Sequence, residues 1–212
     1  MTEITATTFV SLDGVMQAPG GPSEDTRGGF RYGGWTVPHD DETSEAYITE
    51  VFERADGFLL GRRTYDIFAA YWPRVTDPRD PIAAGLNSLP KYVVSGTLTD
   101  PAWHRTTVLG GDPGAAVRRL RERPGREIQI HGSGALVRSL FGQGVIDLYR
   151  VLVFPVYVGT GERLFPHGAA PLGFEVTDRR GIGRGQGITA LTLRPTGAAE
   201  TGSYELPPED QG

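Results

Sequence analysis

The chain has 212 residues, of which 38% are hydrophobic and 22% charged, and its formal net charge is −5. This length allows one domain with a sizeable core, and the negative charge gives no general attraction for nucleic acid or an anionic membrane. The chain contains no cysteine, which excludes disulfides, thiolate nucleophiles and zinc–thiolate sites. We therefore expect a cytoplasmic domain that binds neither nucleic acid nor membranes, and we expect no metal site.

Residues 4–10 are rich in β-branched side chains, which predicts a first strand. The N-terminus has no basic segment followed by a long apolar run, so we expect no signal peptide, and no later stretch is long enough to span a membrane. A segment rich in Gly, Pro, Asp and Ser follows at residues 11–38. Loops of this length in compact domains are usually functional or disordered. Because this loop contains three large aromatic residues, we expect it to pack against the rest of the molecule.

The remainder of the chain alternates helices with strands and ends in two strands. This order predicts an α/β fold whose central sheet is mostly parallel, with an antiparallel C-terminal hairpin. We place a single domain at residues 1–195 and a poorly ordered polar tail at residues 196–212. The predicted helices are residues 39–55, 63–70, 113–123 and 135–141, and the predicted strands are residues 57–61, 91–95, 106–109, 127–131, 146–158, 173–177 and 188–194.

Three of the predicted strands end in a turn made of small, polar or cationic residues. In parallel α/β sheets, ligands bind beyond the carboxyl ends of strands, where helix N-termini present free N–H groups to phosphate. Each turn alone is also explained as solvated arginines, a common strand ending, or a tight glycine turn. Their shared context favours one extended anionic ligand, such as a dinucleotide. The residues are Gly61, Arg62, Arg63 and Thr64 in the first turn, Ser95 in the second, and Gly132, Ser133, Gly134, Ala135 and Leu136 in the third.

Five short segments occur in an order that is typical of one family. They are Ser-Leu-Asp-Gly at 11–14, Gly-Arg-Arg-Thr-Tyr at 61–65, Lys-Tyr-Val-Val-Ser at 91–95, Gly-Ser-Gly-Ala-Leu at 132–136 and Phe-Pro-Val-Tyr-Val-Gly at 154–159. With these segments the chain resembles the dihydrofolate reductase superfamily, specifically the branch related to the reductase domain of the bifunctional riboflavin-biosynthesis deaminase–reductase. The resemblance implies a dihydrofolate-reductase-like three-layer α/β/α fold.

The resemblance also implies a cofactor and a reaction. Arg62, Arg63 and Ser95 would surround a 2′-phosphate, which favours NADPH over NADH, while Thr64 and residues 132–136 would bind the pyrophosphate. The implied reaction is hydride transfer to a small heteroaromatic or imine-type substrate that is pterin-, folate- or aminopyrimidine-like. Because this branch commonly forms homodimers, and the C-terminal hairpin offers a sheet edge, we expect a homodimer.

Two carboxylates are candidates for the catalytic acid. The segment Trp-Thr-Val-Pro-His-Asp at 35–40 resembles the Trp-x-x-Pro-x-Asp of bacterial folate reductases, in which the acid meets the pterin. This match makes Trp35 and Asp40 candidate substrate residues, with Asp40 assisting protonation, although a helix cap equally explains Asp40. Asp13 is the second candidate, and the alternative is that it only stabilises the Asp-Gly turn.

Other positions are expected near the ligand. Glu162 lies close to the predicted cofactor end and is a further candidate. Val153 stands where folate reductases carry a threonine that bonds the acid and the pterin, which argues against dihydrofolate itself. His131 is explained either by packing or by contact with the nicotinamide. A second interpretation stays open, namely a non-catalytic nucleotide- or flavin-binding protein on the same fold.

Overall fold

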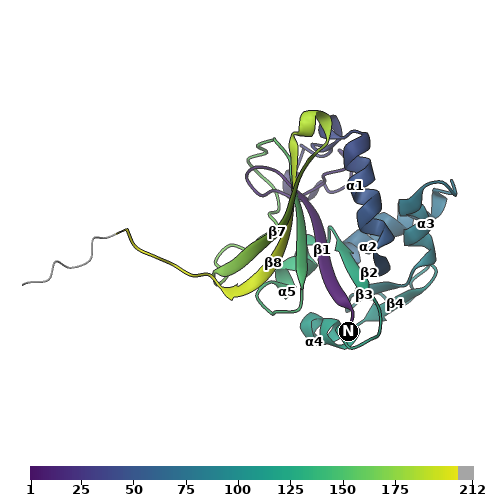
Figure 1. Cartoon of the computed structure of the whole chain (residues 1–212). Coiled ribbons are helices and arrows are strands. Elements are labelled where there is room, and N and C mark those ends of the chain that lie inside the picture. Colours follow the sequence, from purple (N-terminus) through teal and green to yellow (C-terminus); the bar gives the residue numbers. More distant parts are fainter. Residues whose placement is uncertain (205–212) are drawn as a thin grey trace, which may run out of the picture.

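Eight strands form one central sheet in the computed structural model, which describes residues 1–204 (Figure 1). The strands are β1 (Glu3–Val10), β2 (Ala55–Gly61), β3 (Lys91–Val94), β4 (Thr106–Leu109), β5 (Glu127–His131), β6 (Leu148–Val153), β7 (Leu172–Ile182) and β8 (Ile188–Ala198). Their order across the sheet is β4-β3-β2-β5-β1-β6-β8-β7. Neighbouring strands from β4 to β6 are parallel, whereas β8 runs antiparallel to β6 and to β7. The predicted sheet is confirmed.

Helices cover both faces of this sheet, which confirms the three-layer α/β/α arrangement. Side chains of α1 (Glu42–Glu53), α2 (Arg62–Tyr71) and α3 (Pro81–Ser88) pack on one face. Side chains of α4 (Pro113–Arg121) and α5 (Gly134–Leu140) pack on the other face. Short 3-10 turns lie at Arg27–Gly29, Val37–His39, Trp72–Arg74 and Arg184–Gln186. Among the described residues, no helix combines the length and the hydrophobicity that crossing a bilayer requires.

Aspartates determine where three of the helices begin. Asp41 caps α1 by accepting hydrogen bonds from the backbone of Thr43 and Ser44, and the Ser44 hydroxyl completes a capping box. The predicted start at residue 39 was therefore three residues early, because Val37–His39 form a separate 3-10 turn. Asp80 and Asp112 cap α3 and α4 in the same way, each followed by a proline at the first helical position.

The C-terminal strands differ from their predicted bounds. β6 ends at Val153 rather than at residue 158, since Pro155 has no N–H for a ladder. β7 and β8 are each 11 residues long, so the predicted tail at 196–212 begins inside β8, and its residues 205–212 lie outside the described part. Because β8 is paired on both sides, β7 rather than the predicted 188–194 segment forms the sheet edge.

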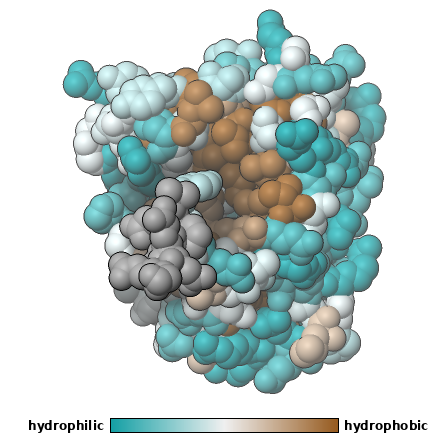
Figure 2. Space-filling model, turned by 60° about the vertical axis from the view of Figure 1, so that its left-hand side comes forward, coloured by the Kyte–Doolittle hydropathy of each residue, from teal (hydrophilic) through white to brown (hydrophobic). Residues whose placement is uncertain are grey.

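The molecule also presents apolar surface. In Figure 2, hydrophobic residues gather in a hollowed area of the face that comes forward in that view. On the β6, β7 and β8 strands, Val153, Phe174 and Leu193 are only partly buried against the core, and Val176 is exposed. The C-terminal hairpin therefore has some apolar surface that the rest of the described chain does not cover.

Candidate functional site

A cavity of about 700 Å³ opens at the carboxyl ends of β1, β2 and β5. This volume suits a small-molecule or cofactor site, and its position follows the rule for parallel α/β sheets. One part of its lining consists of aromatic and aliphatic side chains, and the other part, which we call the rim, consists of arginines and hydroxyl groups of α2 and of the turn and helix at α5. The apolar side chains include Phe9, Ile48, Phe52, Phe68, Ile82 and Leu86, and the rim side chains include Arg62, Arg63, Thr64, Ser133 and Arg138.

Two of the predicted phosphate-type turns meet at this cavity. The backbone N–H of Gly61 donates a 3.0 Å hydrogen bond to the Ser133 hydroxyl, which joins the start of α2 to the start of α5. No side chain caps α2, so its first N–H groups remain available to a ligand. A side chain at Gly134 would collide with Met16, whose sulfur would lie 2.5 Å from a Cβ atom. The structure thus gathers residues 61–64 and 132–136 around one cavity, as the sequence predicts.

The third turn lies beside this rim rather than in the cavity wall. The Ser95 hydroxyl accepts hydrogen bonds from the backbone of Thr97 and Leu98 and is not among the lining residues. Arg62 bridges the two places, because its Nη1 donates to the Thr97 hydroxyl at 3.3 Å while its Nε is 2.9 Å from the Asp66 carboxylate. Ser95 is therefore adjacent to the Arg62 side of the cavity.

Asp13 lies in the turn after β1, where its carboxylate has several hydrogen-bond donors. Its carboxylate accepts hydrogen bonds from the Ser11 hydroxyl and from the backbone N–H groups of Val158 and Gly159 at 2.7–3.0 Å. Burial alone would raise the pKa of Asp13, but these hydrogen bonds outweigh it and lower the pKa. Asp13 does not line the cavity, and it instead ties the turn after β1 to the loop after β6.

Trp35 and Asp40 also lie outside the cavity lining. Trp35 is buried, donates its indole N–H to the Gln17 carbonyl at 2.8 Å and packs edge-on against Phe154. Asp40 follows a 3-10 turn in an extended conformation, and its carboxylate accepts a 3.3 Å hydrogen bond from Ser44. Burial raises the pKa of Asp40. Asp41, and not Asp40, is the cap of α1.

Of the two remaining candidate residues, Glu162 lines the cavity and Val153 does not. Val153 packs on the α4 and α5 side of the sheet, whereas its neighbours Leu152 and Phe154 belong to the cluster on the opposite side. Successive residues of a strand face opposite sides of the sheet. An alignment with folate reductases that is off by one residue therefore selects Val153, which faces away from α1, instead of a neighbour that faces α1. Glu162 does line the cavity, where its carboxylate forms a 2.6 Å ion pair with Arg138.

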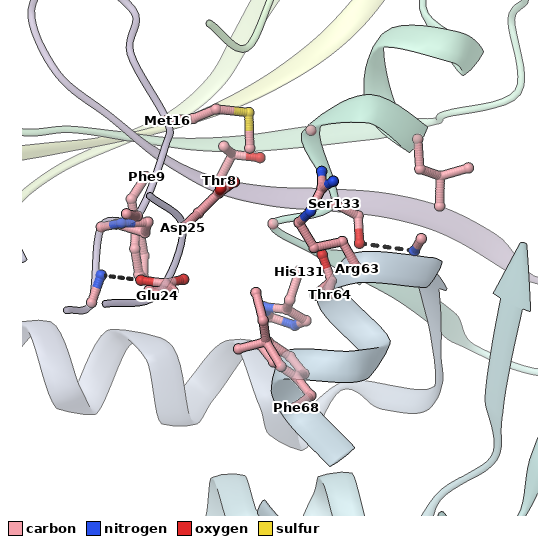
Figure 3. Close-up of a pocket in the computed structure, with 18 of the residues that line it drawn as sticks. Thr8, Phe9, Met16, Glu24, Asp25, Arg63, Thr64, Phe68, His131 and Ser133 are labelled. Atoms are coloured by element: carbon pink, nitrogen blue, oxygen red, sulfur yellow. Dashed lines mark hydrogen bonds between the residues drawn. The ribbon is translucent and has the colours of Figure 1, made fainter. Parts of the chain in front are cut away.

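The loop that follows β1 supplies residues that the sequence analysis missed. Glu24 and Asp25 line the cavity and face Arg63, Thr64 and His131 across it (Figure 3). Burial raises the pKa of Glu24, and backbone N–H groups of the loop oppose that rise only in part. No motif marks Glu24 in the sequence; the aromatic content of the loop predicts only that it packs.

His131 forms part of the cavity floor. It is 8% exposed, stacks on Phe52 with ring centroids 4.3 Å apart, and its Nε2 lies 2.8 Å from Gln129 Oε1. Burial lowers the pKa of His131 to about 3, so the imidazole is neutral at physiological pH. The ring therefore packs as one interpretation of His131 predicts, and because it also lines the cavity, contact with the nicotinamide stays a prediction. Among residues 1–204, no cluster of His, Cys, Asp and Glu side chains is arranged to hold a metal ion.

The sheet order, the three layers and the cavity at the carboxyl ends of the strands define a dihydrofolate-reductase-like α/β protein. Within that class, the sequence profile of the RibD C-terminal domain matches residues 2–186. The chain therefore belongs to the RibD C-terminal domain family.

Comparisons with individual proteins agree with this family. The uncharacterised protein YyaP of Bacillus subtilis (strain 168) is 25% identical over 158 residues, which cover 74% of this chain and 76% of YyaP. The crystal structure of a "Putative riboflavin biosynthesis protein" from Shewanella sp. PV-4 is similar with a TM-score of 0.70 and 21% identity, over 92% of this chain and 99% of that chain. Dihydrofolate reductase from Enterococcus faecalis, complexed with NADP(H), is similar with a TM-score of 0.56 and 12% identity, over 92% and 96% of the two chains. At these identities the two structures show a shared fold.

Proposed function

We propose that this protein is an NADPH-dependent reductase that transfers hydride to a small heteroaromatic or imine-type substrate of the pterin, folate or aminopyrimidine kind. The observation that carries the proposal is the single cavity that joins a cationic, hydroxyl-bearing rim to an apolar interior. A dinucleotide requires the first part for its phosphates, and the ring of a reducible substrate fits the second. Membership in the RibD C-terminal domain family supports the same chemistry.

The residues of the rim fit NADPH. Arg62 and Arg63 would bind the 2′-phosphate, since guanidinium groups form forked, charge-assisted hydrogen bonds with phosphate. The uncapped N-terminus of α2, with Thr64, and the turn at 132–134 would hold the pyrophosphate. When bound, NADPH supplies the hydride. The protein would orient the ring of the substrate against the apolar walls and exclude water from it.

Glu24 is the carboxyl group that best fits the delivery of a proton. It lines the cavity, and burial raises its pKa, so it holds a proton at higher pH than an exposed glutamate does. Asp13 combines a lowered pKa with a position outside the cavity, and Asp40 lies beside Ser44 away from it. We therefore assign protonation of the substrate to Glu24.

The test is a titration of the purified protein with NADPH and, in parallel, with NADH, followed by nicotinamide fluorescence. We expect Arg62→Ala and Arg63→Ala each to weaken NADPH binding by about 10- to 100-fold, the value of a charge-assisted hydrogen bond, while NADH binding changes little. Arg79→Ala is the matched control, because Arg79 is an exposed arginine whose ion-pair partner within residues 1–204 is Asp77 and which does not line the cavity. Equal affinity for the two nucleotides, or binding of neither, would contradict the cofactor assignment.

A non-catalytic nucleotide- or flavin-binding protein is the second candidate. It is favoured by the finding that both carboxylates first expected to be catalytic, Asp13 and Asp40, lie outside the cavity lining. This candidate predicts NADPH or flavin binding without oxidation of NADPH by any dihydropterin or aminopyrimidine. Turnover that is lost in Glu24→Gln, with NADPH binding retained, would exclude it.

A further inference from the structure

A row of buried polar side chains leads along the sheet to the cavity floor. Glu127, Gln129 and His131 alternate along β5 and therefore face the same side, toward α1. Thr7 of β1 is paired in register with His131. Glu127 and Gln129 are 2% and 0% exposed, and the hydrogen bonds that join Gln129 to Glu127 and to His131 are buried.

The direction of each hydrogen bond in the row is determined at its far end. The Glu127 carboxylate accepts hydrogen bonds from Arg150 at 2.6 Å, from Thr5 at 2.7 Å and from Arg54 at 3.1 Å. Burial opposes its charge, but these donors outweigh burial and lower the pKa of Glu127, which stays ionised. An ionised carboxylate only accepts hydrogen bonds. Gln129 must therefore direct its amide nitrogen at Glu127, 2.9 Å away, and at the Val51 carbonyl.

This orientation of Gln129 determines the tautomer of His131. With its nitrogen bound to two acceptors, Gln129 presents its oxygen to His131 Nε2 at 2.8 Å. Nε2 must then carry the proton, and in a neutral imidazole Nδ1 is left as a lone-pair acceptor. Stacking on Phe52 and contact with Phe58 hold the ring in place, with centroids 4.3 and 5.8 Å away. The acceptor is therefore preorganised.

Two polar groups at this floor have no partner in the described part of the chain. His131 makes one side-chain hydrogen bond there, through Nε2, and its Nδ1 makes none within the described residues. The Thr7 hydroxyl is buried without any hydrogen bond, in a side chain that lines the cavity and is 3% exposed. Buried polar groups are normally satisfied, so the unpaired Thr7 hydroxyl, next to the unpaired Nδ1 of a cavity-lining histidine, indicates a ligand group at this part of the floor. Glu24, the group to which protonation of the substrate is assigned, lies across the cavity in Figure 3.

We propose that His131 is a specificity-determining residue, whose Nδ1 accepts a hydrogen bond from an N–H group of the substrate, with the Thr7 hydroxyl making the adjacent contact. Resting on the proposed reductase function, this assignment narrows the substrate to a neutral heteroaromatic ring that bears an amino or lactam N–H on the edge facing β5. A ring of the same shape without that N–H leaves His131 and Thr7 unsatisfied and binds less well.

The first test uses NMR of the 15N-histidine-labelled protein, which has only four histidines to assign. The probes are 2-aminopyrimidine and 2-methylpyrimidine, which share their shape and differ in one N–H donor group. We expect the free protein to show His131 protonated at Nε2 alone, and 2-aminopyrimidine, but not 2-methylpyrimidine, to shift the Nδ1 resonance. Protonation at Nδ1, or equal shifts from both probes, would overturn the proposal.

A third titration uses NADPH alone, because the nicotinamide carboxamide is another source of an N–H donor. An Nδ1 shift with NADPH as large as that with 2-aminopyrimidine would show that the cofactor makes this contact and would overturn the substrate assignment. No such shift with NADPH supports it. If NADPH does not bind at all while the two pyrimidines are still discriminated, the reductase function fails and the role of His131 stands.

The second test compares binding of the same two pyrimidines by variants. His131→Phe keeps an aromatic ring in the stack and removes both nitrogens, and Thr7→Val keeps the side-chain shape and removes the hydroxyl. We expect His131→Phe to abolish a preference of about tenfold for 2-aminopyrimidine and Thr7→Val to reduce it, with NADPH affinity retained. His104→Phe, at an exposed histidine outside the cavity lining, is the matched control. A preference that survives in both His131→Phe and Thr7→Val would overturn the proposal.

Discussion

The two faces of β1, β5 and β6 differ in chemistry although they belong to the same strands. Toward α4 and α5, these strands carry a mostly apolar and uncharged set that includes Ile128, Ile130 and Val151. Toward α1 they carry a buried ionic set that includes Glu127 and Arg150. Apolar burial contributes stability directly, whereas buried charges must be paired to offset their desolvation. Alternate residues of one strand thus serve stability on one face and the orientation of His131 on the other.

Acid should affect the polar face most. The pKa of His131 is lowered by burial from 6.5 to about 3 in the folded state, so below pH 6.5 the unfolded chain binds a proton that the folded one does not. Stability from this group is complete above pH 6.5 and falls until about pH 3, by up to about 5 kcal/mol. Urea unfolding of the wild type and of His131→Phe between pH 7 and pH 4 measures this pH-dependent loss of stability. The difference in free energy of unfolding between wild type and His131→Phe should narrow or reverse as the pH falls. If both proteins lose the same stability over this pH range, the lowered pKa of His131 is not the cause.

Removal of one charge should be the next largest effect. Glu127→Ala leaves Arg150 buried without its carboxylate, since the two side chains are 3% and 5% exposed and 2.6 Å apart. We expect a loss of about 4 kcal/mol in the free energy of unfolding. The double variant Glu127→Leu, Arg150→Met removes both charges and should recover most of that loss. If the double variant is no more stable than Glu127→Ala, the uncompensated charge is not the cause.

Truncation of a side chain on the apolar face should lower the free energy of unfolding by a smaller amount, and this loss should not depend on pH. Ile130 stands between Gln129 and His131 in the sequence, but its side chain faces the opposite side of the sheet. It is completely buried there, against α4 and α5. Ile130→Ala should cost about 3 kcal/mol at every pH, since it creates a cavity and changes no charge. The discrimination between 2-aminopyrimidine and 2-methylpyrimidine should be unchanged. A pH-dependent loss in this variant would show that the two faces are not separable.

Local patterns were enough to predict most of the sheet and the cationic rim of the cavity. The strand Glu127–His131 was predicted with its observed bounds, because β-branched and polar residues alternate between flanking turns. The turns at 61–64 and 132–136 could be grouped because parallel strands bring their carboxyl ends to one edge. Helix α3 was missed because its sequence, which begins with proline and contains glycine, has low helix propensity.

The acidic residues of the site depend on contacts that no local pattern reveals. Glu24 reaches the cavity because the Gln17 side chain donates to the carbonyls of Asp25 and Arg27 and so shapes the loop. Asp40 misses the cavity because the turn before α1 places its carboxylate beside Ser44. Both placements result from tertiary contacts within a long loop, in which spacing carries little information.

The strand order has a consequence for synthesis of the chain on the ribosome. β1 is made well before both of its neighbours, which are distant in sequence: Glu3 pairs with Glu127, and Thr5 pairs with Leu148. More than half of the chain must therefore emerge before β1 gains either partner, and contacts of such long sequence separation form slowly. Until then the nascent chain holds an unpaired, β-branched strand, and unpaired strands are prone to associate with other chains.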